Sequence, residues 1–143
     1  MKNKFIIAIM FFFINTNLFA ENFLIQAKNI TLDKDKQTSI FENDVSVKTE
    51  DGYLIKSDYA KYNKITGIII LKRNITGVDK KNNTVIAEYA KYNKKTKTFN
   101  SEGLTKVITT EKYIIESSDV TLNNNEGFIE SNKDTTVTDL DNN

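Results

Sequence analysis

The sequence YAKYNK stands at residues 59–64 and returns letter for letter at residues 89–94, an offset of 30 positions. Weaker copies lie one period away on either side, at residues 29–33 (NITLD) and 119–123 (DVTLN). Self-similarity at a fixed period of about 20 to 50 residues is the sequence signature of stacked repeat architectures. The repeat therefore organises nearly the whole chain after its first 20 residues.

Strand-like patterns fill the space between recurring turns. Residues 53–59 (YLIKSDY) and 85–89 (VIAEY) alternate in polarity and are rich in Ile, Val and Tyr. Asn, Asp and Gly gather in between, as at residues 63–67 (NKITG) and 79–83 (DKKNN), because these residues tolerate left-handed or locally bonded backbone. The pattern predicts two β-strands per repeat, and no later stretch keeps the period of an α-helix.

Alternation sends successive side chains to opposite faces of a strand. Each repeat would then have one apolar face and one face rich in Lys, Asp and Glu. We expect an all-β stack of antiparallel strands that folds over, so that the apolar faces meet around an elongated slot. The chain contains no cysteine and no proline, so backbone pairing and apolar burial must stabilise it without disulfides.

Residues 1–20 have the layout of a secretory signal peptide. Lysines at positions 2 and 4 precede an unbroken apolar run at residues 5–14, and the segment ends on Ala20. That run is shorter than the roughly 20 residues that an α-helix needs to span a bilayer. We expect cleavage after Ala20 and one exported domain at residues 21–143.

The composition argues against several functions. Removing the two leader lysines leaves 18 of the 20 basic residues against 19 acidic ones, so nothing favours a nucleic-acid partner. Histidine and cysteine are both absent, which removes the common nucleophile and base pairs and the usual zinc ligands. We expect no enzyme activity, no catalytic residue, no cofactor and no metal ion.

Several motifs resemble the OstA-like family. Residues 41–47 (FENDVSV) are similar to its G-N-V-x-V strand, with Asn43-Asp44 in place of Gly-Asn. Residues 55–60 (IKSDYA) and 85–90 (VIAEYA) match its (I/L)-x-A-(D/E)-x-(A/V) strand, and residues 62–67 (YNKITG) resemble its Y-(D/N)-x-x-T turn. The family includes the periplasmic lipopolysaccharide-transport bridge protein and the amino-terminal periplasmic domain of the outer-membrane lipopolysaccharide-assembly protein.

The resemblance implies a β-jellyroll folded like a taco, open at both ends, in the periplasm or associated with the outer membrane. Its apolar interior would hold the acyl chains of lipopolysaccharide. Its partners would be inner- and outer-membrane transport components, or further copies of the chain in a homo-oligomer, joined edge to edge. A sheet edge without proline is itself a template for strand addition.

The apolar positions of the strands are the predicted lining of a lipid groove. The same residues would fill any β-sandwich core, and the family resemblance favours the groove for the set as a whole. The alternative function is a structural or adhesive β-solenoid with a sealed core. The predicted lining residues are Phe41, Val45, Val47, Ile55, Tyr59, Val85, Ala87, Tyr89, Ile115 and Val120.

Residues 139–143 (DLDNN) repeat the turn class that elsewhere introduces the next strand. Two interpretations stay open for this ending. The last repeat could be an open edge for a partner, or the chain could be the amino-terminal piece of a longer outer-membrane assembly protein.

Overall fold

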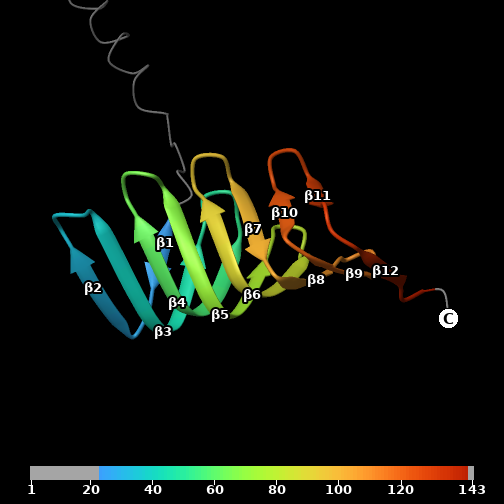
Figure 1. The fold of residues 1–143 in the computed structure, drawn as a ribbon, viewed down its shortest axis with the longest axis horizontal. Helices are drawn as coiled ribbons and strands as arrows, with labels where there is room; N and C mark the ends of the chain where they lie inside the picture. Colours follow the sequence, from blue (N-terminus) through green and yellow to red (C-terminus); the bar gives the residue numbers. More distant parts are fainter. Residues whose placement is uncertain (1–22, 142–143) are drawn as a thin grey trace, which may run out of the picture.

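The computed structural model describes residues 23–141, and every regular element in that range is a β-strand (Figure 1). The expected signal peptide and its cleavage site lie outside the described residues. Within residues 23–141 no helix is long and apolar enough to cross a membrane. The strands are β1 (Leu24–Gln26), β2 (Asn29–Asp33), β3 (Thr38–Lys48), β4 (Leu54–Asn63), β5 (Ile68–Val78), β6 (Thr84–Asn93), β7 (Thr98–Glu102), β8 (Leu104–Ile108), β9 (Tyr113–Ser118), β10 (Val120–Asn123), β11 (Phe128–Ser131) and β12 (Thr136–Asp139).

All the strands belong to one 12-stranded antiparallel sheet that bends along a crease. The register of β3 shifts at Asn43 and Asp44, whose φ angles are 66° and 51°. The register of β5 shifts at Arg73 and Asn74, whose φ angles are 64° and 51°. Inserted residues of this kind bend a strand and increase its twist. Towards the C-terminus the bend becomes a break, at Gly103 between β7 and β8 and at Asp119 between β9 and β10.

The crease divides the sheet into two faces that pack against each other. Face A contains β2, β7, β10 and β11 with the adjoining halves of β3 to β6, and face B contains β1, β8, β9 and β12 with the other halves. The hairpin turns of face A stand at the top of Figure 1, and the crease runs along the bottom. We call the side opposite the crease the mouth, because the turns of both faces lie there.

The turns repeat with the period of the sequence. In face A, Asn63 Oδ1, Asn93 Oδ1 and Asn123 Oδ1 each accept hydrogen bonds from two following backbone N–H groups. In face B, Thr49 Oγ1 and Thr109 Oγ1 each accept a hydrogen bond from the backbone N–H four residues on. Short polar side chains that bond nearby backbone explain why these residues recur at the turns.

The core lies between the two faces. The side chains of Val47, Ile55, Ile69, Leu71 and Ile75 are fully buried there. Burial alternates along the straight parts of β5, β6, β7 and β8, as the period-two pattern requires. The all-β, antiparallel, jellyroll-like fold predicted from the sequence is confirmed.

Candidate functional site

The interior of the folded sheet is lined by rows of residues that lie opposite one another on successive strands. In face B one row follows the register from β1 to β12 without a charged residue. In face A the row nearest the mouth, which we call the mouth row, passes from β3 to β11. The face B row is Ile25, Val47, Ile55, Gly77, Val85, Val107, Ile115 and Val137, and the mouth row is Ser39, Tyr62, Ile69, Tyr92, Phe99, Leu122 and Ile129.

Eight of the ten predicted lining residues face this interior. Seven of the eight are buried, and Ile115 is half-buried against the core. The structure brings them together across both faces, while their contact with a ligand stays a prediction. The eight residues are Phe41, Val45, Val47, Ile55, Val85, Ala87, Ile115 and Val120.

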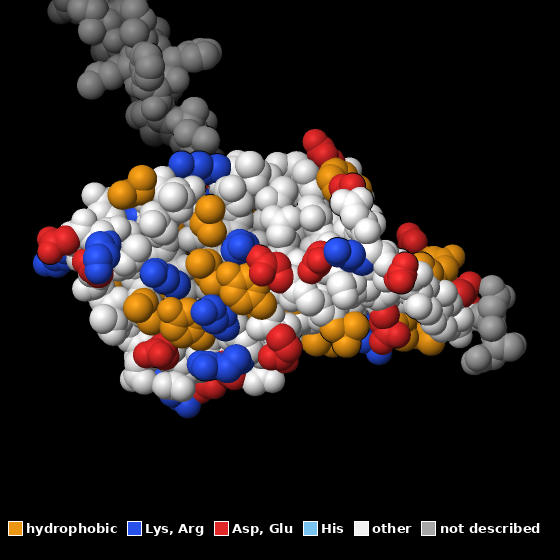
Figure 2. All heavy atoms as spheres, viewed as in Figure 1, with side chains coloured by type: hydrophobic (Ala, Val, Ile, Leu, Met, Phe, Trp, Pro, Cys, Tyr) orange, Lys and Arg blue, Asp and Glu red, His pale blue; other side chains and the backbone are white. Residues whose placement is uncertain are grey.

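Tyr59 and Tyr89 lie on the outer surface of face A, so the prediction that they line the groove is corrected. Lys72 Nζ lies 5.6 Å from the centre of the Tyr59 ring and 5.9 Å from that of Tyr89, within the range of cation–π contacts. Lysine and hydrophobic side chains intermingle on the surface that faces the viewer in Figure 2.

The physical reason is a change of parity at the crease. The buried positions of β4 are Ile55, Ser57 and then Ala60, so one interval is three residues instead of two. The same step separates Ala87 from Ala90 in β6. A period-two count carried across the crease therefore selects the wrong tyrosine of each YAKYNK copy.

Three further aromatic residues lie in the interior and were missed by the sequence analysis: Tyr53, Tyr92 and Phe99. The Tyr53 ring centre lies 6.3 Å from that of Tyr92 and 6.5 Å from that of Phe99, distances typical of aromatic pairs. The repeated second tyrosine of YAKYNK was the available signal. These three rings join face B to face A midway along the sheet, and we call them the waist.

The two tyrosines of the waist are held in their neutral form. Burial is the main reason that the pKa of the Tyr92 hydroxyl is raised far above its usual value, and its hydrogen bond to Asp51 adds to the effect. Burial likewise raises the pKa of Tyr53, with smaller contributions from the charges of Asp79 and Asp51. Tyr92 therefore remains a hydrogen-bond donor at ordinary pH.

Two hollows lie on either side of the waist. The C-terminal hollow is a cavity of about 90 Å³ whose lining includes Val85, Val107, Leu122 and Ile129. This volume is below the roughly 300–1,000 Å³ of ordinary ligand pockets, so the interior needs to open before it holds a large ligand. The N-terminal hollow, of about 420 Å³, is more open than the C-terminal one. Its lining lies in face A, at the β2–β3 turn and the end of β4, and is largely polar around Tyr62.

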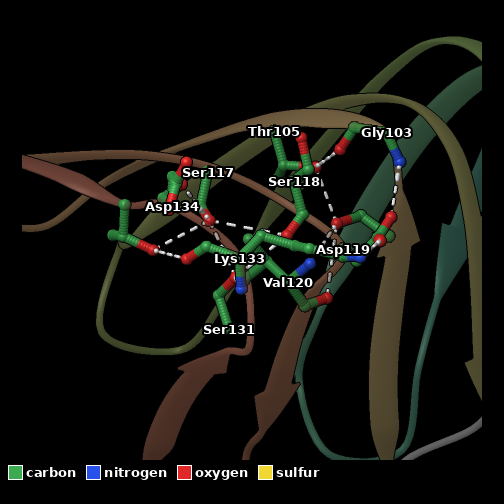
Figure 3. A network of polar contacts seen from close by, with 11 residues as sticks. Gly103, Thr105, Ser117, Ser118, Asp119, Val120, Ser131, Lys133 and Asp134 are labelled. Carbon is green, nitrogen blue, oxygen red and sulfur yellow. Dashed lines mark hydrogen bonds and ion pairs between the residues drawn. The ribbon is translucent and has the colours of Figure 1, made fainter.

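Hydroxyl groups secure the crease at its C-terminal end, where the strands are broken (Figure 3). The buried Ser101 Oγ accepts hydrogen bonds from Thr105 Oγ1 at 2.6 Å and from the Val120 N–H at 3.0 Å. Ser117 Oγ lies 2.7 Å from Ser131 Oγ and accepts a hydrogen bond from Thr135 Oγ1 at 2.9 Å. This network is structural, because each buried polar side chain in it has a partner.

Both ends of the sheet expose apolar side chains on strands that have a single neighbour. At the N-terminal end, β2 pairs only with β3 and carries Ile30 and Leu32, exposed at 53% and 64%. At the C-terminal end, β12 pairs only with β9 and carries Val137, exposed at 59%. Strands with one partner leave a row of backbone N–H and C=O groups available for pairing.

Together these features define a class of protein: an open-ended antiparallel β-jellyroll with an apolar interior and two free edges. No family model and no curated protein matches the chain. Among solved structures, the chain is similar to the crystal structure of LptH, the LptA-homologous periplasmic component of the conserved lipopolysaccharide transport device from Pseudomonas aeruginosa. The TM-score is 0.71 at 12% sequence identity, over 82% of this chain and 94% of LptH. The likeness confirms, at the level of the fold, the resemblance first suggested by the motifs.

Proposed function

We propose that this protein is a periplasmic bridge module that binds lipopolysaccharide and passes it toward the outer membrane. The observation that carries the proposal is the uncharged face B row, which is continuous from β1 at one edge to β12 at the other. An apolar path of this kind suits acyl chains, because burying them removes hydrocarbon from water at about 0.8 kcal/mol per CH₂ group. The fold that the chain shares with LptH supports the same function.

The module would act passively. Its interior supplies an apolar environment for the acyl chains. A lipid that gains similar burial in each successive module can move between them without a large change in free energy. Energy and direction would come from an ATP-driven component elsewhere in the pathway, as the family resemblance implies.

Neighbouring modules would join through the free edges. The edge formed by β1 and β2 differs in sequence from that formed by β11 and β12, so a contact between them is heterologous and lets copies repeat in one direction. Strand addition would extend both the backbone ladder and the face B row from one module into the next. The partner would be a transport component of the same fold or a second copy of this chain.

A structural β-solenoid with a sealed core is the second candidate. It is favoured by the complete burial of Ile69 and Phe99 and by the small volume of the C-terminal hollow. The two candidates differ in one requirement: a transport module must admit lipid to its interior, and a solenoid must not.

Photo-crosslinking in cells distinguishes these candidates. A photoreactive residue at Ile115 or Ile129 would face the interior, and the matched control at Lys61 lies exposed on the outer surface of β4. The transport function predicts covalent lipopolysaccharide adducts at the interior positions and none at Lys61. If the folded, exported protein gives no adduct at any position, the sealed solenoid is the better account.

A further inference from the structure

Contacts between the two faces close the mouth near its middle. Asp51, in the turn between β3 and β4 of face B, accepts a hydrogen bond at its Oδ1 atom from Tyr92 Oη in face A, at 2.5 Å. Its backbone oxygen accepts a second one, at 3.2 Å, from Nδ2 of Asn124, which follows β10. The neighbouring Glu50 forms an ion pair of 3.0 Å with Lys94 Nζ, also in face A. We call these contacts the clasp.

The turn that carries the clasp has a defined conformation. Thr49 is fully buried, and its Oγ1 atom accepts a hydrogen bond of 2.9 Å from the Tyr53 N–H. Gly52 has φ of 88°, a left-handed conformation that glycine adopts without steric cost. The equivalent turns of face B lie at residues 79–83 and 109–112. There Asn83 accepts a hydrogen bond from the Thr110 N–H, and Lys112 forms an ion pair with Asp141. Unlike the clasp, these contacts join residues of face B to one another.

The clasp bonds Tyr92 of the waist, which lies between the two hollows along the mouth row. Along the mouth row, Ile69, Tyr92 and Phe99 have exposed fractions of 0%, 1% and 0%. On one side of them Tyr62 lines the N-terminal hollow, and on the other side Leu122 lines the C-terminal hollow. A ligand that moves from one end of the interior to the other must therefore displace the waist.

We propose that the turn at residues 49–52 is a gate, which must release Tyr92 and Asn124 before an acyl chain can pass between the two hollows. This inference rests on the proposed function, because it assumes that acyl chains enter the interior. Opening requires the loss of the clasp, the separation of Tyr53 from Tyr92 and Phe99, and the release of Phe23 from Tyr62 and Lys94. The crease need not change, because its hydrogen bonds lie on the opposite side of the sheet from the mouth.

Site-specific crosslinking to purified lipopolysaccharide tests the gate in the mature chain. A photoreactive phenylalanine derivative replaces Phe99 in the waist or Ile129 in the C-terminal hollow. In the otherwise unchanged chain, adducts should form readily at Ile129 and weakly at Phe99. Tyr92→Phe keeps the ring but removes the hydroxyl, so it should raise the Phe99 adducts by about two- to tenfold, the effect expected of one hydrogen bond. Lys91→Gln, which breaks a pair within face A, is the matched control and should leave both yields unchanged.

Locking the gate provides the opposite perturbation. The chain has no cysteine, so Glu50→Cys with Lys94→Cys can be bridged by a short bifunctional thiol reagent that reduction removes. Bridging should abolish the Phe99 adducts and spare those at Ile129, and reduction should restore them. The control pair, Lys91→Cys with Glu102→Cys, bridges two strands of face A and should have no effect on either yield.

Three results are distinguishable. The gate is supported if the adduct yield at Phe99 rises with Tyr92→Phe and falls reversibly with the bridge, while the yield at Ile129 stays unchanged. If the adduct yields at Phe99 and Ile129 are equal and neither Tyr92→Phe nor the bridge changes them, the gate is overturned and the proposed function stands. Absence of adducts at both positions in every folded variant overturns the proposed function itself.

Discussion

Single polar side chains hold positions that the hydrophobic pattern alone does not define. Ser101 is 3% exposed, and its Oγ atom bonds both Thr105 and the backbone of Val120. Such a residue contributes little through its own size. Its importance is that it accepts a hydrogen bond from the buried Val120 N–H at the break between β9 and β10.

Ser101→Ala should lower the free energy of unfolding by about 1–3 kcal/mol, because it leaves the buried Val120 N–H without a partner. Urea denaturation followed by circular dichroism measures the change. Ser46→Ala, on the outer side of β3, is the matched control and should change the free energy by less than about 0.5 kcal/mol. Equal effects of the two substitutions would show that the Ser101 network is not stabilising.

The waist tyrosines predict a specific response to alkaline pH. Their pKa values are raised on folding, so the neutral hydroxyls stabilise the folded state fully below the unfolded pKa of about 10. That stabilisation is lost as pH rises above about 10, because the unfolded chain releases the protons first. The free energy of unfolding should therefore fall above this pH, and Tyr92→Phe should make the fall less steep. If the free energy of unfolding of the unchanged protein and of Tyr92→Phe fell equally steeply with pH, Tyr92 would not be a source of the alkaline response.

At the scale of strands, the crease depends on residues that accept left-handed backbone. Asn74 has φ of 51°, donates its N–H to Glu88 and donates its side-chain amide to Asp58 at 2.7 Å. Asparagine is one of the few residues other than glycine that visits this region at low cost. The sequence pattern thus predicts each long strand as one extended segment. In the structure the strand bends at the crease, so its two halves run in different directions.

Asn74→Val should destabilise the protein by about 1–3 kcal/mol, because a β-branched residue is strained at positive φ. Asn74→Gly removes the same side-chain hydrogen bond but relieves the backbone, so it should cost clearly less. The difference between the two variants, measured by thermal unfolding, reports the conformational requirement alone. No difference would mean that the bulge relaxes to ordinary strand geometry.

The repeat explains how much of the fold the sequence could predict. The 30-residue period, the turn residues and the strand pattern are local features, and the structure reproduces all of them. The parity change between Ser57 and Ala60 is not local, since it depends on how β4 pairs with two neighbours across the crease. In β4 and β6 the inward direction of Ile55, Val85 and Ala87, before the crease, was therefore predicted correctly, and that of Tyr59 and Tyr89, beyond it, was not.

At the scale of the molecule, the clasp was also beyond prediction from sequence. Asp51, Tyr92 and Asn124 lie in different repeats, and no shared motif marks them as a group. They meet only because the sheet folds over. The free edges, by contrast, follow from strand order once the repeat is recognised.

Charging a free edge should weaken any association between copies. Val137→Lys places a cation on β12, where an incoming strand would pair, and should lower the association constant by about tenfold or more. Leu104→Lys is the control, because Leu104 is exposed at 80% but its strand β8 has a neighbour on both sides. Sedimentation velocity over a range of concentrations measures both. Equal weakening would indicate general repulsion between charged molecules.

The turns at Asn63, Asn93 and Asn123 are interchangeable in their bonding. A duplicated segment beginning at one of them could therefore be spliced in at the next without disturbing either junction. Each such insertion adds two strands, which lengthens the sheet by about 10 Å at the usual strand spacing. The length of the sheet is therefore set by the number of 30-residue repeats in the chain. Adding or removing one repeat would change the length of the molecule by a fixed step and leave its cross-section the same.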